Sequence, residues 1–294
     1  MPLDQFDIDK EELPAQYRSK LPDVLKSTVP AEMTFLEHLD VLRKHLVRSS
    51  IITICVTIVV AFCISFIYDE IILAPTKNDF ITFKVFCRLA DLWNSPVLCM
   101  TVKEVQFHNR SMGGQFTMHM TSSFTIGMIL SFPFIVYQIW SFVSPGLKNN
   151  EAKATTGIVF FCSLLFFIGI AFGYYLVMPL SHQFLASYTI SNSIVNEFDL
   201  DSYLSTFIDI ILACGLMFQL PMLVYILTKL GIIGGAFMIK YRKHAVAVIL
   251  ILAAVLTPPD VLSMILLSIP LLILYEVSIF ISKIVEKRSA KIVI

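Results

Sequence analysis

Residues 50–68 read SIITICVTIVVAFCISFIY, a run without a charged side chain. A helix of about 20 apolar residues crosses the roughly 30 Å hydrocarbon core of a bilayer, where every backbone polar group must be hydrogen-bonded internally. The run therefore predicts a membrane-spanning helix. Residues 1–34 are polar and acidic and lack the basic-then-apolar pattern of a secretory signal, so we expect this span to be retained.

The composition of the whole chain agrees with a membrane protein. Charged residues make up 15% and hydrophobic residues 56% of its 294 residues, whereas soluble domains have about 25% charged residues. A soluble chain of this length has no core that could hide so much apolar surface. Its formal net charge is zero, which argues against a broadly basic surface for nucleic acid.

The apolar segments predict an all-α membrane protein with six transmembrane helices. We place them at about residues 50–68, 116–143, 154–178, 203–230, 244–256 and 261–285. Pro133 and Pro221 are expected to kink the second and fourth helices. The fifth segment is only about 20 Å long as a helix, and Pro258 and Pro259 end it. We therefore expect the last two helices to be short and joined by a tight turn.

The orientation follows from lysine and arginine, which are enriched in cytoplasmic loops. Residues 179–201 contain neither, and the long loop 69–115 has five basic residues matched by five acidic ones. Both loops are therefore expected outside, and so is the turn at Pro258 between the last two spans, which also contains neither. The remaining connections and ends are expected in the cytoplasm because they carry clustered basic residues: Arg43, Lys44, Arg48, Lys148, Lys153, Lys229, Lys240, Arg242, Lys243, Lys283, Lys287, Arg288 and Lys291. Both termini are predicted to be cytoplasmic.

This pattern predicts one membrane domain over residues 34–285. A charged, poorly periodic arm over 1–33 precedes it, and a cytoplasmic tail over 286–294 follows. Cys87 and Cys99 both lie in the outer loop 69–115, where an oxidising compartment permits a disulfide. Spacing alone leaves a disulfide and two free thiols as alternatives.

Four stretches of the sequence resemble the TatC family, the multispanning component of the twin-arginine protein translocase. They are EHLDVLRK (37–44), PFIVYQIWSFVSPGL (133–147) reaching Glu151, FQLP (218–221) and LTPPD (256–260). Their order and their predicted sides agree with the family, and the resemblance covers most of residues 33–285. The chain departs from the family at Val41, where a glutamate usually precedes Leu-Arg, and at Gln219, where many relatives have glutamate.

The resemblance implies a function and partners. Such proteins recognise signal peptides with two adjacent arginines and gather single-span TatA- or TatB-type proteins, so that folded cargo crosses the inner membrane under the proton-motive force. It also implies a concave shape and assembly of several copies in the membrane lipid. No cofactor is implied, and neither a catalytic motif such as HExxH or GxSxG nor metal-ligand spacing occurs in the sequence.

The candidate signal-peptide residues are acids on the cytoplasmic side. Paired arginines suit carboxylates, and the candidates are Glu151, Glu37 and Asp40, with Phe142 expected to pack against the apolar part of the signal. The alternative is that these acids are solvated charges at helix ends, each worth about 0.3–1 kcal/mol against the helix dipole. Val41 leaves open whether Asp40 replaces the family's glutamate, since one residue turns a helix by about 100°.

Polar groups inside the expected spans form a second candidate site. Asp209 and Gln219 are costly in a membrane and usually face protein or water, and ten residues of helix would place them about 80° apart around its axis. They either dock a partner's transmembrane helix or form hydrogen bonds to another span. A secondary transporter is the main rival function, because Asp209 and Glu276 could relay protons, and a vesicle uptake assay separates the two functions.

Overall fold

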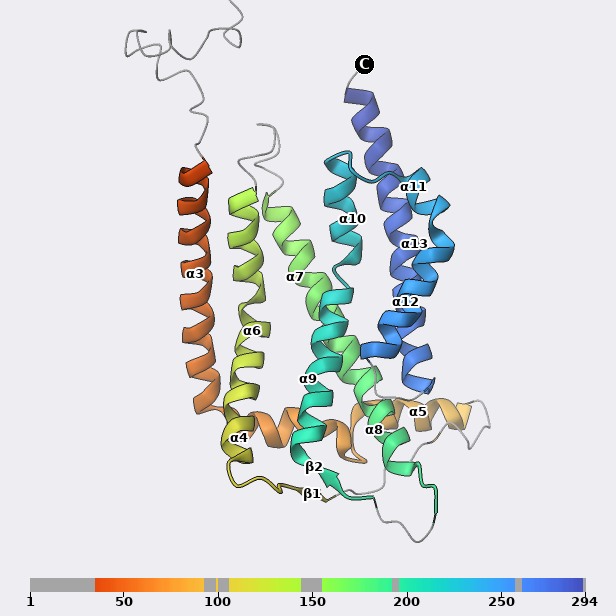
Figure 1. The fold of residues 1–294 in the computed structure, drawn as a ribbon. Helices are drawn as coiled ribbons and strands as arrows, with labels where there is room; N and C mark the ends of the chain where they lie inside the picture. Colours follow the sequence, from red (N-terminus) through yellow and green to blue (C-terminus); the bar gives the residue numbers. More distant parts are fainter. Residues whose placement is uncertain are drawn as a thin grey trace, which may run out of the picture. The chain divides into compact units, whose positions relative to one another are not determined.

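The computed structural model describes residues 35–92, 99, 106–143, 155–191, 196–256 and 261–292, most of them helical (Figure 1). The elements in chain order are α3 (Phe35–Phe62), α4 (Ile64–Ile67), η1 (Tyr68–Ile72), η2 (Ala74–Thr76), α5 (Ile81–Leu92), β1 (Phe107–His108), α6 (Gly114–Val143), α7 (Thr155–Phe172), η6 (Gly173–Val177), α8 (Met178–Ser187), β2 (Phe198–Asp199), α9 (Leu200–Met217), α10 (Leu220–Lys229), α11 (Gly235–Lys240), α12 (Arg242–Leu256) and α13 (Val261–Ile292).

The chain divides into two compact units, Met1–Lys44 and His45–Ile294. In the first unit the described residues are the first turns of α3, from Phe35 onward. The expected polar arm over 1–33 lies outside the described residues, so that part of the predicted domain division stays a prediction. The ion pair between Asp40 and Lys44 lies in the first unit, and the contacts between helices all belong to the second unit.

Five helical stretches of the described chain are long and apolar enough to cross a membrane: Leu39–Phe62, Gly114–Val143, Gly157–Ser187, Leu200–Lys229 and Met264–Lys287. They correspond to five of the six expected spans. The sixth candidate, α12, has 15 residues, or about 22 Å of helix. It is short, as its sequence predicts, and the count of six spans stays a prediction.

The expectation that the last helix is short is wrong. α13 has 32 residues and continues through the polar segment that we expected to be a separate tail. Two contacts of its last turns help to explain the extension. Ser282 accepts a buried hydrogen bond from Thr228 of α10 at 3.0 Å, and Glu286 accepts one from the backbone N–H of Gly235 at 3.1 Å.

The first span also differs from the expected range. α3 already begins at Phe35 and ends at Phe62, so the motif before the apolar run is helical. A turn at Cys63 separates α3 from α4 and the π-helical η1. The hydroxyls of Tyr68 and Ser122 lie 2.8 Å apart and share a hydrogen bond. The end of the expected span is therefore a separate segment that packs against α6.

The core gathers around α9, which contacts α6, α7, η6 and α12. Its buried side chains include Phe207, Ile210 and Cys214, and the same cluster includes Leu267 and Leu271 of α13. α7 approaches α9 closely at Gly169, where an added Cβ would lie 2.6 Å from the carbonyl oxygen of Cys214. Small residues permit such close backbone approach between membrane helices.

Segments far apart in the sequence meet at one end of the second unit. β1 pairs in parallel with β2, with Phe107 opposite Phe198, and Arg110 forms an ion pair with Glu197 at 2.7 Å. α5, β1 and β2 lie at the opposite end from α11 and the last turn of α6 (Figure 1). The two loops that the charge pattern assigns to one side of the membrane are therefore neighbours in space.

Candidate functional site

The last turns of α6 form a corner with α3. His45 Nδ1 donates to Oε1 of Gln138 at 2.6 Å, and the His45 ring lies edge-on to Phe142 with 6.4 Å between ring centroids. Trp140 is buried on another side of α6, in a cluster with Ile158 and Cys162 of α7. These contacts hold the end of α6 between two helices and so fix where the following segment begins. We call His45, Gln138 and Phe142 the α3–α6 corner.

The acidic candidates before the first span lie on α3. Asp40 forms an ion pair with Lys44 at 2.7 Å, and more than half of each side chain is exposed. Exposed pairs of this kind contribute about 0.2–1 kcal/mol, so Asp40 can exchange Lys44 for another cation at small cost. The backbone of Glu37 is part of α3, and its side chain is not among those described.

Glu151, the main candidate for binding arginine, lies outside the described residues. It belongs to the segment 144–154, which joins the end of α6 to the start of α7. Pro258, Pro259 and Asp260 also lie outside the described residues, between α12 and α13. Their expected roles stay predictions.

The helix of the fourth expected span is interrupted before Pro221. α9 ends at Met217 and α10 begins at Leu220, with Pro221 in its first turn, where the missing proline N–H is tolerated. Gln219 lies in this break, and its Nε2 donates to the carbonyl oxygen of Cys162 on α7 at 3.0 Å. The side chain is half-buried, so the observed contact is the hydrogen bond to another span that the sequence left as an alternative.

Asp209 lies on α9, and its side chain is exposed. The break after Met217 means that α9 and α10 are not one regular helix, so the angle of about 80° expected between Asp209 and Gln219 does not carry over. The structure places them on separate helical segments. Partner binding by either residue stays a prediction.

Glu276, the residue that a proton relay would need on α13, has an ion-pair partner. Both Nε and Nη2 of Arg242 on α12 contact its Oε1. The pair links α12 to α13, and the neighbouring Tyr275 hydroxyl donates to the carbonyl oxygen of Met238 on α11 at 2.9 Å. These contacts give Glu276 a structural role at the junction of three helices.

Two cysteines of the loop 69–115 form a covalent link. Cys87 on α5 and Cys99 are joined by a disulfide. Cys162 and Cys214 are buried free thiols, and Cys55 and Cys63 are exposed free thiols. Among the described residues no group of three or more His, Cys, Asp or Glu side chains is placed to hold a metal ion.

The sequence matches a known family over most of its length. Residues 37–270 match the profile of the family described as Sec-independent protein translocase protein (TatC). The chain belongs to the TatC family. It is therefore a component of a protein translocase and a membrane-spanning protein, not an enzyme.

Individual TatC proteins cover nearly the same residues. The chain is 39% identical to TatC of Blattabacterium sp. subsp. Periplaneta americana over 87% of its own length and 97% of the relative's. It is 31% identical to TatCy of Bacillus subtilis over 88% of its own length and 92% of that protein's. A crystal structure of the twin-arginine translocase receptor TatC in DDM superposes with a TM-score of 0.68, at 27% identity, and covers 84% of this chain and 100% of that one.

The structure adds one TatC contact that the sequence analysis did not single out. The hydrogen bond between His45 and Gln138 joins residues 93 positions apart. His45 directly follows the first quoted motif, and Gln138 lies inside the second. The sequence did indicate that both polar side chains lie at the same membrane surface. That they bond to each other could be seen only from the packing of α3 on α6.

Proposed function

We propose that this chain is the receptor and core component of a twin-arginine translocase in the inner, cytoplasmic membrane. It binds the twin-arginine signal peptides of folded proteins and assembles, in several copies, with single-span TatA- or TatB-type partners for export driven by the proton-motive force. Two solved structures similar to this chain are of twin-arginine translocase receptors. Membership of the TatC family and the five apolar helical stretches also support this proposal.

The α3–α6 corner is the observation that carries the proposed signal-peptide site. Two of the four family motifs meet there. Gln138 and Phe142 belong to the second motif, and His45, which contacts both, directly follows the first. The segment with Glu151 starts one residue after Val143, the last residue of α6. A carboxylate on this segment offers the arginine pair a bidentate acceptor, while Phe142 offers the signal an apolar surface.

Binding of a synthetic twin-arginine signal peptide to the purified full-length protein tests this site. Glu151→Gln keeps the size of the side chain and removes its charge, and Glu151→Asp keeps the charge and shortens the reach. Losing one partner of a desolvated charged contact costs about 2–5 kcal/mol, so we expect Glu151→Gln to weaken binding at least about thirtyfold. Glu151→Asp should be intermediate. A peptide with two lysines should bind the parent protein poorly, because lysine cannot make the bidentate contact.

A matched control is available at the other end of the second unit. Asp91 is an exposed carboxylate on α5, so Asp91→Asn removes the same charge away from the proposed site and should bind the peptide like the parent protein. Parental affinity of Glu151→Gln would contradict the proposed site, and so would an equal loss in Asp91→Asn. The amount of protein in the membrane is measured in parallel, because a loss caused by poor accumulation would not support binding.

We further propose that α9 and α10 receive the transmembrane helix of a partner. Asp209 is an exposed carboxylate at membrane depth, where a polar partner side chain would lower its cost. Gln219 lies in the helix break, where its amide already bonds to Cys162. An amide with one bonded N–H keeps a second N–H and its carbonyl oxygen for further hydrogen bonds. This supports a role for Gln219 both in joining two spans of its own chain and in binding a partner helix.

A further inference from the structure

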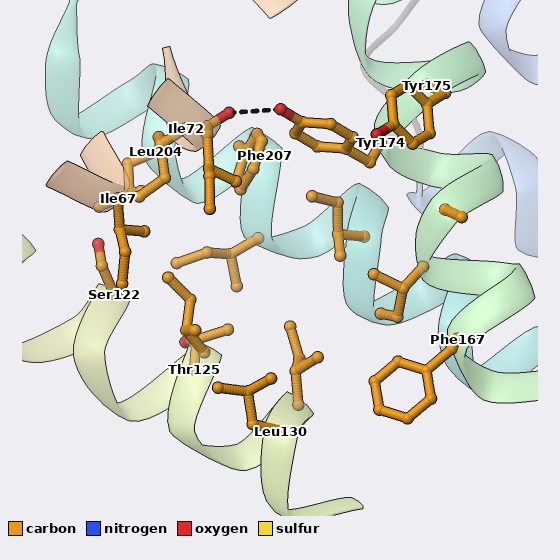
Figure 2. A pocket seen from close by; sticks show the side chains of 17 residues that line it. Ile67, Ile72, Ser122, Thr125, Leu130, Phe167, Tyr174, Tyr175, Leu204 and Phe207 are labelled. Atoms are coloured by element: carbon orange, nitrogen blue, oxygen red, sulfur yellow. Dashed lines mark hydrogen bonds between the residues drawn. The ribbon is translucent and has the colours of Figure 1, made fainter. Parts of the chain in front are cut away.

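Two cavities in the second unit share a pair of tyrosines, Tyr174 and Tyr175 of η6. The first has a volume of about 400 Å³ and lies between η1, α6, α7, η6 and α9 (Figure 2). Apolar side chains form nearly all of its wall, and Leu130 and Phe167 are exposed there. It is therefore an apolar cavity that is open at the protein surface.

The second cavity, also of about 400 Å³, has a mixed lining that is far more polar than that of the first, and we call it the polar cavity. Glu70, Lys77 and Asp79 line it together with Phe80. The ring of Phe80 stacks on Tyr175 with 5.8 Å between centroids. The Tyr174 hydroxyl donates to the carbonyl oxygen of Ile71 at 2.9 Å, which fixes η6 against η1 (Figure 2).

The charges of the polar cavity are only partly neutralised. Asp79 forms an ion pair with Lys84. Lys77 donates to the backbone carbonyl of Asp69 at 2.8 Å, which leaves its positive charge and two further donors. Within the described part of the chain, Glu70 has no hydrogen bond or ion pair. With Asp79 paired to Lys84, the cavity thus offers a ligand the carboxylate of Glu70 and the ammonium of Lys77, beside three aromatic rings.

The position of the two tyrosines along their helix indicates how deep the cavities lie in a bilayer. Tyr175 follows Gly157, the first residue of its candidate span, by about 27 Å of helix, close to the roughly 30 Å thickness of the hydrocarbon core. From this spacing we infer that the polar cavity lies at headgroup depth and the apolar cavity at the depth of the acyl chains.

We propose that the two cavities together bind one phospholipid with a phosphoethanolamine headgroup. The phosphate meets Lys77, the primary ammonium meets Glu70, and one acyl chain enters the apolar cavity below Tyr174 and Tyr175. A carboxylate beside aromatic faces recognises an ammonium group. The separate cation and anion match a zwitterion, whereas a phosphoglycerol headgroup would leave Glu70 without a partner.

Photocrosslinking of the full-length protein in liposomes tests the proposal. The probes are phosphatidylethanolamine and phosphatidylglycerol with the same diazirine-bearing acyl chain, and mass spectrometry maps the labelled residues. We expect label on the wall of the apolar cavity, including Leu130 and Phe167, at about tenfold higher yield from the ethanolamine probe, the low end for a hydrogen bond to a charged group. Glu70→Gln should lower that yield to that of the glycerol probe, and the control Asp91→Asn should not.

A second pair of variants tests the apolar cavity. Ala171 lies in its wall, so Ala171→Phe fills it and should reduce labelling there from both probes. Ile168 is exposed on the same helix and is not part of the wall, so Ile168→Phe should leave the labelling unchanged. Three outcomes would overturn the proposal. The label could be spread evenly over the exposed apolar faces of α3 and α12, the two probes could give equal yields, or Glu70→Gln could leave the yield unchanged. Absence of lipid label from the cavity alone would show that a protein segment occupies it and would overturn the proposal as well.

Discussion

Gly169 on α7 is the position where one added methyl group tests the helix packing most directly. Its ideal Cβ would lie 2.6 Å from the carbonyl oxygen of Cys214, 2.9 Å from Cβ of Phe218 and 3.0 Å from Cα of Gly215. Two of these atoms belong to the backbone of α9, so no side-chain rotation relieves the clash. Gly169→Ala must therefore move α7 away from α9.

The magnitude follows from two opposing effects. Overpacking a well-packed core costs about 1–3 kcal/mol, and alanine gains up to about 1 kcal/mol over glycine in a helix interior. We expect a net loss of about 1–2 kcal/mol for Gly169→Ala. Gly157 on the same helix has no atom within 4 Å of its ideal Cβ, so Gly157→Ala keeps only the helix-propensity gain.

Thermal unfolding of the purified proteins in one detergent measures this difference. A change of 1 kcal/mol shifts the Tm by about 2–4 °C in soluble domains of 150–250 residues. Gly169→Ala should melt several degrees below the parent protein, and Gly157→Ala at or above it. A Tm of Gly169→Ala equal to that of Gly157→Ala would show that α7 and α9 separate freely and that their close approach does not constrain the fold.

Three further predictions concern the topology, the outer disulfide and the partner helix. In a chain freed of its native cysteines, a membrane-impermeant thiol reagent applied to intact cells should modify a cysteine at Ser95 and not one at Asn150; labelling at Asn150 would reverse the proposed orientation. Cys87 and Cys99 should resist alkylation until a reductant is added, since closing a loop of this size is worth about 3 kcal/mol in the chain-entropy model; alkylation of both without reduction would exclude the bond in cells. Gln219→Leu should weaken crosslinking of a partner helix to α10, by about 0.6 kcal/mol for an average interhelical polar contact, and unchanged crosslinking would leave the bond to Cys162 as the only role of Gln219.

Much of the fold could be predicted because hydropathy is a local property. The expected spans at 116–143 and 203–230 nearly coincide with the observed stretches Gly114–Val143 and Leu200–Lys229, and the expected short helix at 244–256 corresponds to α12. The ends of the first and last helices could not be predicted in this way. α3 extends through a charged motif and α13 through a polar tail, since a helix's own hydrogen bonds continue wherever side chains permit, regardless of hydropathy.

The candidate site, like the fold, could be predicted only in part from the sequence. The motif residues could be named from the order of the sequence, and Asp40 occupies an exposed helical position, while the side of the membrane on which they lie stays a prediction. The role of Gln219 could not be decided from the sequence, because a polar side chain at membrane depth can find its hydrogen-bond partner either inside the protein or on another protein. Only the position of the Cys162 carbonyl shows which bond this chain makes on its own.

The sequence by itself determined that this protein spans a membrane, that its apolar segments are helices and that it resembles the TatC family. Those conclusions depend on hydropathy, length and motif order, all of which are read along the chain. The tertiary structure alone decided that His45 meets Gln138, that Gly169 touches the backbone of α9 and that Tyr174 and Tyr175 border two cavities of opposite polarity. Each of these joins residues distant in sequence, and their pairing depends on how whole helices pack against one another.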